Sequence, residues 1–503
     1  MSDFMENDNK KTRSKSALII ILVSLFLIFI LPIAFVLTVS FLLPPVYNET
    51  FVGELGEKYE LLCSTEDPKI VVIGGSSVAF GLDSEMVENE LDMPVVNFGL
   101  YANLGTKLMV DLSKANVGEG DVIIIAPEMN AQTLSLYFNA DTAMQSMDGN
   151  FGMLKSIDSE NYTDLAGALW NFSADKLAYL TSGNPPSNTG AYSKEWFNSY
   201  GDSTYDRPYN VMTVASKNIT LDFRYDKDDG IDSEYEKFID YINDYVEFCN
   251  ERGATVYFSF PPMNKSSLTD YNTEENVKAF YENLSSSVNA KVISNINDYI
   301  LDEGYFFDSE FHLNNSGVMV RTVRLIDDIK REMGKTDTTM AEDELPSPSG
   351  FAPVDFEGGD EENLYFELEL TKNGAGQSVW MIIGLNEEGK KQLRLTIPGN
   401  TGGYPIAIIA ENAFADSELR TLAIGKNVTT ILSGAFGAAD HLESVYVNTA
   451  EPTDISVPNN ADENGLITKG ASENLRLYVP KESLGSFKTD YFWGDYASII
   501  IGY

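Results

Sequence analysis

The chain has 503 residues, of which 35 are basic and 76 acidic, so its formal net charge at pH 7 is −41. This charge excludes nucleic-acid binding through a basic surface, because such proteins use positive side chains to displace the counterions of phosphates. It also argues against adhesion to anionic membranes or wall polymers by bulk charge. The length predicts two or three domains.

The N-terminus predicts a membrane anchor. A polar head at residues 1–16, with four basic side chains, precedes an uncharged apolar run at residues 17–43. About 20 apolar residues suffice to cross a bilayer, and no small-residue cleavage pattern follows the run. Since basic residues precede the run and acidic residues follow it, the positive-inside rule predicts a cytoplasmic N-terminus and an extracellular remainder.

Residues 44–333 predict an α/β domain. Short apolar runs that are typical of buried strands occur at 70–73, 95–97, 122–126, 255–260 and 291–294. Amphipathic helical stretches lie between several of them, which predicts a doubly wound parallel sheet with helices on both faces. The stretch 131–230 is aromatic-rich and aperiodic. It has two interpretations: an insertion that forms a wall or lid over a site, or a solvated loop region.

A linker and a repeat follow the α/β domain. Residues 334–362 are acidic and rich in Pro, Gly, Ser and Thr, which is typical of a linker. Beyond them, Ile409 and Phe414 recur as Ile431 and Phe436, 22 residues later. A period of this length, with apolar residues at fixed offsets, predicts a short stacked solenoid with capping segments at its ends.

A Gly-Ser turn follows the first predicted strand. In KIVVIGGSSVAFGLD, Ser76 and Ser77 stand at the carboxyl end of that strand, where parallel sheets bind ligands. A nucleophilic serine needs a base, usually a histidine that a carboxylate orients. Of the two histidines, His441 lies in a repeat, whereas His312 precedes the last predicted helix of the α/β domain and follows Asp308 by four residues. Each of these features is also typical of ordinary turns and capping pairs.

These residues resemble the SGNH, or GDSL-type, hydrolases over about residues 69–333. IGGSSVAFG aligns with the first block of that family, which implies Ser76 as the nucleophile and Ser77 as the alternative. The last block aligns with the segment from Asp308 to His312, one residue longer than the usual spacing. The family resemblance implies a flavodoxin-like sheet and an Asp-His pair that activates the serine. Glu310, within that segment, is an alternative orienting group.

The resemblance also implies an oxyanion hole. The backbone N–H groups of Ser76 and Ala102 align with the backbone donors, with Gly99 near the second of them. Asn130, in VIIIAPEMN, aligns with the side-chain donor, and Glu128 stands beside it.

Gly75 departs from the family pattern, which has Asp at this position. Together with the anchor and the long Asp-to-His loop, this departure resembles the extracytoplasmic acyl-transfer proteins, such as the teichoic-acid D-alanyl transfer and alginate O-acetylation proteins. The resemblance implies a Ser-His-Asp acyl-enzyme cycle on an ester or thioester, ended by water or a sugar hydroxyl. The implied partners are an acyl donor, a carbohydrate acceptor and a membrane protein that delivers the acyl group, and neither a cofactor nor a metal is implied.

Residues 363–503 resemble the BspA-type leucine-rich repeats of bacterial surface proteins, on the repeats and on the ending LYVPKESLGSFKTDYFWGDYASII. In that family the repeats bind proteins or other surface ligands. The alternative function is therefore a surface adhesin or scaffold whose α/β domain is inactive.

The two cysteines, Cys63 and Cys249, are both predicted to lie outside the membrane, where oxidising conditions permit a disulfide. The sequence leaves open whether they pair, and neither has the spacing of a metal ligand.

Overall fold

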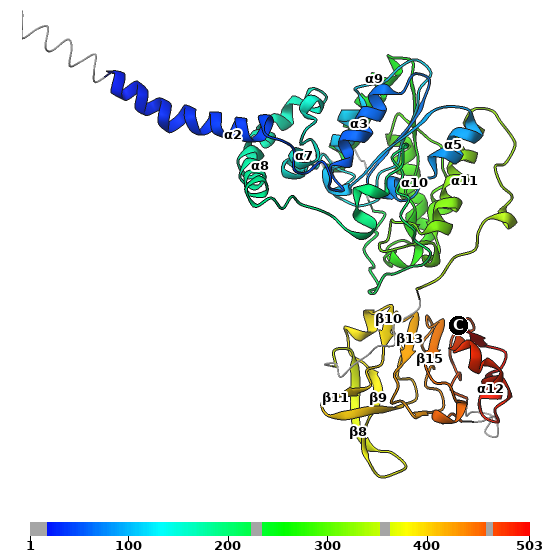
Figure 1. The fold of residues 1–503 in the computed structure, drawn as a ribbon. Coiled ribbons are helices and arrows are strands. Elements are labelled where there is room, and N and C mark those ends of the chain that lie inside the picture. Colours follow the sequence, from blue (N-terminus) through cyan, green and yellow to red (C-terminus); the bar gives the residue numbers. More distant parts are fainter. Residues whose placement is uncertain (1–17, 223–233, 353–362, 459–465) are drawn as a thin grey trace, which may run out of the picture. The chain divides into compact units, whose positions relative to one another are not determined.

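The computed structural model describes residues 18–222, 234–352, 363–458 and 466–503, so the predicted head at residues 1–16 lies outside the described residues. The chain divides into two compact units (Figure 1). The first unit comprises Met1–Arg207, Ile219–Leu301 and Phe311–Ser347. The second unit comprises Pro208–Asn218, Asp302–Glu310 and Pro348–Tyr503.

The predicted anchor is helical. Leu18–Leu42 forms a helix of 25 residues that is long and apolar enough to cross a membrane. It includes a π-helical turn, η1 (Phe26–Ile30), and ends as α2 (Leu31–Leu42). Most of its side chains are exposed, and only in α2 do some become buried, among them Val39 and Ser40.

A five-stranded parallel sheet forms the centre of the first unit. Its spatial order is β2-β1-β3-β4-β6, where the strands are β1 (Ile70–Gly74), β2 (Val95–Gly99), β3 (Val122–Ile125), β4 (Thr255–Phe258) and β6 (Lys291–Val292). All residues of β1 and β3 are buried, as expected for parallel strands with both faces covered. Each predicted apolar run contributes a strand, so the predicted parallel sheet is confirmed. Separately, β5 (Met263–Asn264) pairs with β7 (Ile300–Leu301).

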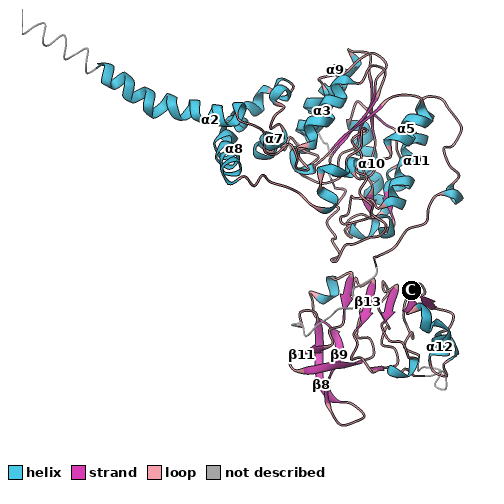
Figure 2. Cartoon of the chain, viewed as in Figure 1, coloured by secondary structure: helices cyan, strands magenta, loops and turns pink. Residues whose placement is uncertain are grey.

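Helices cover both faces of this sheet (Figure 2). Outside the predicted insertion they are α3 (Glu54–Ser64), α4 (Ser76–Ala79), α5 (Ser84–Leu91), α6 (Thr106–Ser113), α9 (Glu234–Asn250), α10 (Glu274–Ser287) and α11 (Asn315–Glu332). Val87 of α5 and Ile326 of α11 pack on the face formed by Ile70 and Val72. Because strand side chains alternate, Val71 points to the opposite face, where α6 and α9 contact the sheet.

The predicted insertion folds into packed helices. It contains α7 (Ala140–Ser146) and the 21-residue α8 (Tyr162–Ser182), which ends at Gly183 in the left-handed conformation. Met144 and Phe172 from these helices are buried. This packing favours a wall over a solvated loop region for the described part of 131–230, while residues 223–230 lie outside the described residues.

The second unit contains two sheets. The strands of its parallel sheet follow chain order: β10 (Arg394–Thr396), β13 (Thr421–Ile424), β15 (Ser444–Val447), β16 (Arg476–Val479) and β17 (Ile500–Gly502). The other sheet has the order β11-β12-β9-β8, with strands β8 (Phe366–Lys372), β9 (Ser378–Leu385), β11 (Asn400–Thr401) and β12 (Tyr404–Ile409), and β14 (Thr430–Ile431) pairs with β12. One apolar core lies between them, and α12 (Leu484–Thr489) contributes Phe487 to it near the C-terminus.

The residues that the repeat analysis matched are neighbours in space. Ile409 pairs with Ile431 in the parallel ladder between β12 and β14. The rings of Phe414 and Phe436 stack with centroids 6.1 Å apart. The 22-residue period therefore corresponds to one layer of the second unit.

The division into units differs from the single predicted boundary near residue 333. Two segments inside the predicted α/β domain, 208–218 and 302–310, belong to the second unit. There Asn210 donates its side-chain amide to the Glu303 carbonyl at 2.8 Å, and the Glu303 carboxylate pairs with Arg420. Residues 334–347 of the predicted linker belong instead to the first unit.

Both cysteines are free: Cys63 is exposed on α3 and Cys249 is buried on α9. Burial raises the pKa of the Cys249 thiol to about 11, so this cysteine stays protonated near neutral pH.

Candidate active site

Ser76 stands where β1 ends and α4 begins. Its side chain is 7% exposed, whereas Ser77 is 0% exposed. The Ser77 hydroxyl is buried without a hydrogen-bond partner among the described residues. Of the two candidate nucleophiles, Ser76 is therefore the less buried.

Glycines allow the backbone to pack closely around this turn. A Cβ atom at Gly74 would lie 2.6 Å from the Ala126 carbonyl oxygen, and one at Gly99 would lie 2.7 Å from the Gly75 carbonyl oxygen. Such contacts are closer than real Cβ atoms show, so these positions need glycine. Gly74, the first glycine of the pair that precedes Ser76, thus has a steric role in this turn.

Glu128 is a site residue whose role the sequence analysis missed. It follows β3, is buried, and accepts a hydrogen bond from the Ser77 backbone N–H through Oε1 at 2.9 Å. Its Oε2 is buried without a hydrogen-bond partner in the described part of the chain. A Cβ atom at Gly75 would collide with both carboxylate oxygens. The Glu128 carboxylate therefore occupies the space that a side chain at position 75 would need.

Phe80 lies one helical turn after Ser76, and its ring packs on His312. The Phe80 N–H donates to the Ser76 carbonyl oxygen at 2.9 Å, and residues four apart on a helical turn share a face. The Phe80 ring stacks on the His312 ring with centroids 4.7 Å apart. His312 itself is held just before α11, where the Asn314 side chain caps the helix by accepting from the Gly317 N–H at 3.1 Å. Phe80 thus contacts both candidate residues, through its backbone N–H to Ser76 and through its ring to His312.

Tyr192, from the predicted insertion, contacts the candidate base. Its Oη lies 3.2 Å from His312 Nδ1. When Nδ1 carries the proton, it donates to this hydroxyl oxygen, and Nε2 then presents the lone pair that a general base needs. The sequence analysis missed this residue because the insertion shows no periodicity that would place its tyrosines.

The candidate orienting carboxylates fall in the other unit. Asp308 and Glu310 belong to the segment 302–310 of the second unit, whereas His312 belongs to the first. Glu310 Oε1 accepts a hydrogen bond from the Asn218 side chain at 2.6 Å. Because Glu310 is engaged in this hydrogen bond, Asp308 stays the preferred candidate for the carboxylate that orients His312.

The candidate oxyanion donors lie in loops after β2 and β3. Ala102 opens the 3₁₀ turn η2 (Ala102–Leu104). Asn130 Oδ1 accepts hydrogen bonds from the backbone N–H groups of Gln132 and Thr133, both at 3.0 Å. Since this oxygen stabilises its own turn, the NH₂ group is the part of Asn130 that could donate to a substrate. Both oxyanion roles stay predictions.

A buried polar network fixes the insertion to the end of the sheet. Asp202 accepts from the Asn97 side chain at 2.8 Å and from the Ser84 hydroxyl at 2.7 Å. Burial raises the pKa of the Asp202 carboxyl, although these two hydrogen bonds oppose the shift. Lys58 donates to the Asn97 carbonyl at 3.0 Å, and burial lowers its pKa. This network joins α3, β2, α5 and the segment that leads to Ser203, whose N–H bonds the Ala79 carbonyl at 2.9 Å.

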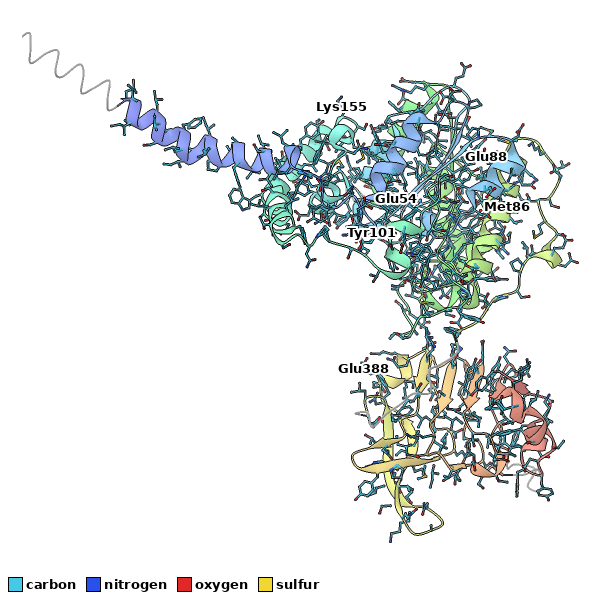
Figure 3. All side chains as sticks on the ribbon, viewed as in Figure 1. Glu54, Met86, Glu88, Tyr101, Lys155 and Glu388 are labelled. Carbon is cyan, nitrogen blue, oxygen red and sulfur yellow. The ribbon has the colours of Figure 1, made fainter. Side chains whose placement is uncertain are left out.

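Acidic and basic side chains also meet on α3. Glu54, which Figure 3 labels, is buried beside Lys58, and burial raises the pKa of its carboxyl. Removal of either partner would leave the other charge buried and uncompensated, which destabilises a fold.

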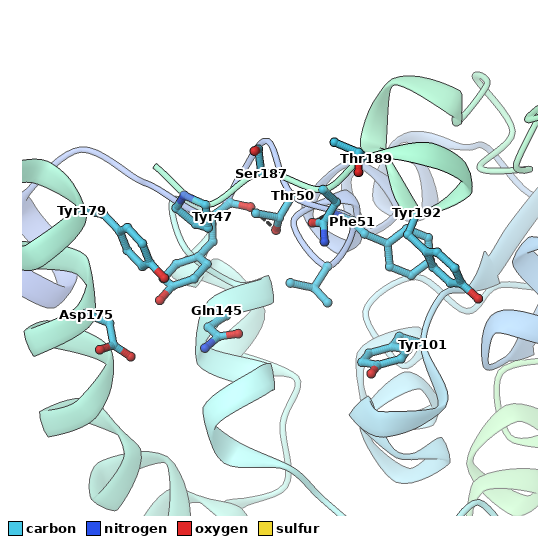
Figure 4. Close-up of a pocket in the computed structure, with 13 residues that line it drawn as sticks. Tyr47, Thr50, Phe51, Tyr101, Gln145, Asp175, Tyr179, Ser187, Thr189 and Tyr192 are labelled. Atoms are coloured by element: carbon cyan, nitrogen blue, oxygen red, sulfur yellow. Dashed lines mark hydrogen bonds between the residues drawn. The ribbon is translucent and has the colours of Figure 1, made fainter. Parts of the chain in front are cut away.

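A cavity of about 800 Å³ in the first unit adjoins these residues. Tyr47, Tyr101, Tyr179 and Tyr192 line it (Figure 4). Between the rings lie the polar side chains of Thr50, Gln145, Asp175, Ser187, Asn188 and Thr189. No Lys, Arg or His is among its described lining residues. The lining therefore disfavours an anionic ligand, and it suits a ligand that offers hydroxyl groups to the carboxylate and the other polar side chains and a flat face to the rings.

The cavity and the candidate base share Tyr192. Phe51, which also lines the cavity, packs against Tyr192 with ring centroids 5.5 Å apart and against Phe80 with centroids 6.0 Å apart. The rings of Phe51 and Tyr192 would thus separate a ligand in the cavity from His312. Comparison with protein-family models and with curated proteins finds no match for this chain.

Proposed function

We propose that this chain is a membrane-anchored, cell-surface serine acyltransferase or esterase that acts on O-acyl groups of envelope or extracellular carbohydrate. The observation that carries the proposal is the placement of Ser76 at the end of β1, one helical turn before the phenylalanine that stacks on His312. The anchor holds the N-terminus in the cytoplasm and the remaining chain outside.

The strand order supports an SGNH-type, flavodoxin-like fold for the first unit. Numbered within the sheet, the order is 2-1-3-4-5, and all the pairs are parallel. Folds of this order bind ligands at the carboxyl ends of the strands where the order reverses, which is the end of β1. Ser76 begins the turn at that point. The family has Asp at position 75, and its side chain would collide here with the Glu128 carboxylate, which fills the adjacent space. This explains why glycine stands at this position.

The proposed cycle has two steps. In the first, His312 Nε2 takes the hydroxyl proton of Ser76 while Oγ attacks the ester carbonyl carbon, and the N–H groups of Ser76 and Ala102 with Asn130 hold the oxyanion. The C–O or C–S bond of the donor breaks, and the leaving oxygen or sulfur takes the proton from His312. In the second step, His312 takes a proton from water or a sugar hydroxyl, whose oxygen attacks the acyl carbon. The bond between the acyl carbon and Oγ then breaks, and Oγ takes the proton back from His312. Asp308 orients His312 in this proposal, with Tyr192 as a second group at Nδ1.

The aromatic cavity supports a carbohydrate acceptor. Tyrosine rings stack on the apolar faces of sugars, and amide and hydroxyl side chains pair with sugar hydroxyls. The second unit, as a BspA-type leucine-rich repeat, binds a surface ligand or a partner protein. Its regular layers also favour the second candidate function, a surface adhesin or scaffold whose first unit is inactive.

Fluorophosphonate labelling of the full chain in nanodiscs, with peptide mapping of the adduct, tests the proposal. We expect an adduct on Ser76 that is lost in Ser76→Ala and in His312→Ala. Ser77→Ala is the matched control, because its hydroxyl has no described partner to lose, and it should label normally.

Two other outcomes are informative. An adduct on Ser77 would keep the mechanism and move the nucleophile by one residue. A folded chain that takes no label would contradict the enzymatic proposal and support the adhesin. Mass spectrometry of an added oligosaccharide after incubation with 4-nitrophenyl acetate then separates transfer, which acetylates the sugar, from hydrolysis, which releases acetate.

A further inference from the structure

α8 presents an uncharged apolar face to the outside of the first unit. Ala166, Trp170, Ala174 and Leu177 follow one another at spacings of four, four and three, so they form one stripe along the helix. Trp170 is 63% exposed. A tryptophan this exposed, with the exposed Ala166 and Ala174 on the same stripe, indicates a surface that meets something other than water.

The charged residues of α8 lie away from this stripe. Lys176 is buried, and it pairs with the buried Asp148 of the neighbouring loop at 2.7 Å. Asp164 and Asp175 are displaced from Trp170 by about a third of a turn or more, as the 3.6-residue period requires. Asp175 lines the aromatic cavity instead. The stripe therefore has no charge of its own, although the chain as a whole carries −41.

α8 lies beside the outer end of the membrane-spanning helix (Figure 1). Lys176 Nζ donates to the carbonyl oxygen of Ser40 in α2 at 3.1 Å. Phe41 of α2 lines an apolar cavity of about 210 Å³, whose other walls include Leu165, Ala166 and Leu169 of α8. The apolar face of α8 is thus continuous with the apolar surface of α2.

Helix length puts this junction at the membrane surface. The 25 residues of Leu18–Leu42, at about 1.5 Å each, make a helix about 37 Å long, and the hydrocarbon core is about 30 Å thick. The surplus of about 7 Å leaves the last turns of α2, which hold Ser40 and Phe41, at the level of the lipid headgroups. Trp and Tyr side chains are enriched at this level.

We propose that α8 is an interfacial helix that rests on the outer leaflet of the membrane spanned by α2. Trp170 lies among the headgroups, and the small cavity beside Phe41 takes part of a lipid acyl chain. Because the stripe is uncharged and the chain is acidic, apolar contact holds the helix there and anionic lipids are not needed. This proposal rests on the anchor and is independent of any catalytic activity.

Bromolipid quenching of tryptophan fluorescence tests this placement. The full chain is put into nanodiscs of phosphatidylcholine, with and without brominated acyl chains, as wild type, Trp170→Phe and the control Trp196→Phe. We expect bromination to quench the wild type and the control, and we expect most of this quenching to be lost in Trp170→Phe. Trp170 is on the surface, and Trp196→Phe keeps an aromatic ring at a half-buried position beside Tyr205, so all three proteins should fold.

Equal quenching of all three proteins, or none in any of them, would overturn the proposal. In the second case the emission of Trp170 tells what covers the face. Emission at long wavelength places it in water, whereas short-wavelength emission that depends on the number of chains in each nanodisc assigns it to a second copy of this chain.

Discussion

Both units contain a five-stranded parallel sheet, but the strands are ordered differently. In the first unit the order β2-β1-β3-β4-β6 departs from chain order, and in the second unit the strands from β10 to β17 follow it. Reordering brings residues that are far apart in the sequence to one edge, as with Ser77 and Glu128, which follow the adjacent strands β1 and β3. Sequential stacking brings together only residues about one repeat apart, as with Phe414 and Phe436. The first arrangement can assemble a reactive site, while the second extends a surface.

The largest expected effect is a loss of stability in the second unit alone. Phe436→Ala removes a fully buried ring that stacks on Phe414, and we expect it to lower the free energy of unfolding of the second unit by about 3–5 kcal/mol. Calorimetry of the full chain in detergent should show the shift in one transition, with labelling of Ser76 unchanged. Leu432→Ala, at an exposed position of the same repeat, is the control. An equal shift of all transitions would mean that the units unfold as one.

A smaller loss of stability is expected when the turn that precedes Ser76 is disrupted. Gly75→Ala places a methyl group against both oxygens of Glu128, and overpacking of this kind costs about 1–3 kcal/mol. The same unfolding measurement should show the loss in the first unit. Because Glu128→Ala removes the obstructing carboxylate, the double variant should recover most of the loss. A double variant no more stable than Gly75→Ala would contradict the steric explanation.

Tyr192→Phe tests whether the insertion takes part in positioning the base. Loss of one hydrogen bond, worth about 0.5–1.5 kcal/mol, should lower kcat for ester hydrolysis by about 2- to 12-fold with little change in KM. Tyr101→Phe, which alters the same cavity, should leave kcat unchanged. Asp308→Asn should cause the larger loss if Asp308 orients His312. An unchanged kcat in Tyr192→Phe would limit that tyrosine to packing.

The smallest expected effect concerns acid stability in the first unit alone. Burial acts to raise the pKa of Asp111, but Lys114, Tyr241 and Lys107 outweigh it, so the net pKa is lowered. A carboxyl with a lowered pKa stabilises the fold above its unfolded pKa of about 3.9, and the stability is lost as pH falls through the folded value. Asp111→Asn should therefore flatten the acid side of the stability profile of the first unit. The profile of the second unit should stay the same, and a change there would contradict the assignment.

Local pattern was enough to predict the strands, and it also singled out the candidate pair, which stays a prediction. The apolar run at 70–73 and the glycines after it marked Ser76, and the scarcity of histidine marked His312. The layer spacing of the second unit followed from Ile409 and Ile431. These features depend on residues close in sequence or on a repeated period, so they can be read along the chain.

Other features depend on tertiary packing and could not be predicted. Nothing near Tyr192 in the sequence shows that its hydroxyl reaches His312. The contact of Glu128 with the turn at Gly75 requires the adjacency of β1 and β3, although a glycine in place of an expected Asp was a signal that something else fills the space. The assignment of 208–218 and 302–310 to the second unit depends on long-range partners such as Glu303 and Arg420.

The backbone crosses between the two units five times. A stop codon after Gly334 would therefore not release an intact first unit. It would leave 208–218 and 302–310 without the strands and the Arg420 guanidinium that they contact, and Glu303 would lose its counter-charge. Truncation at the apparent linker would thus remove the repeats and also damage the loop that carries Asp308, so the two effects could not be told apart. Point substitutions on the exposed side of the repeats are the safer way to test whether they bind a ligand.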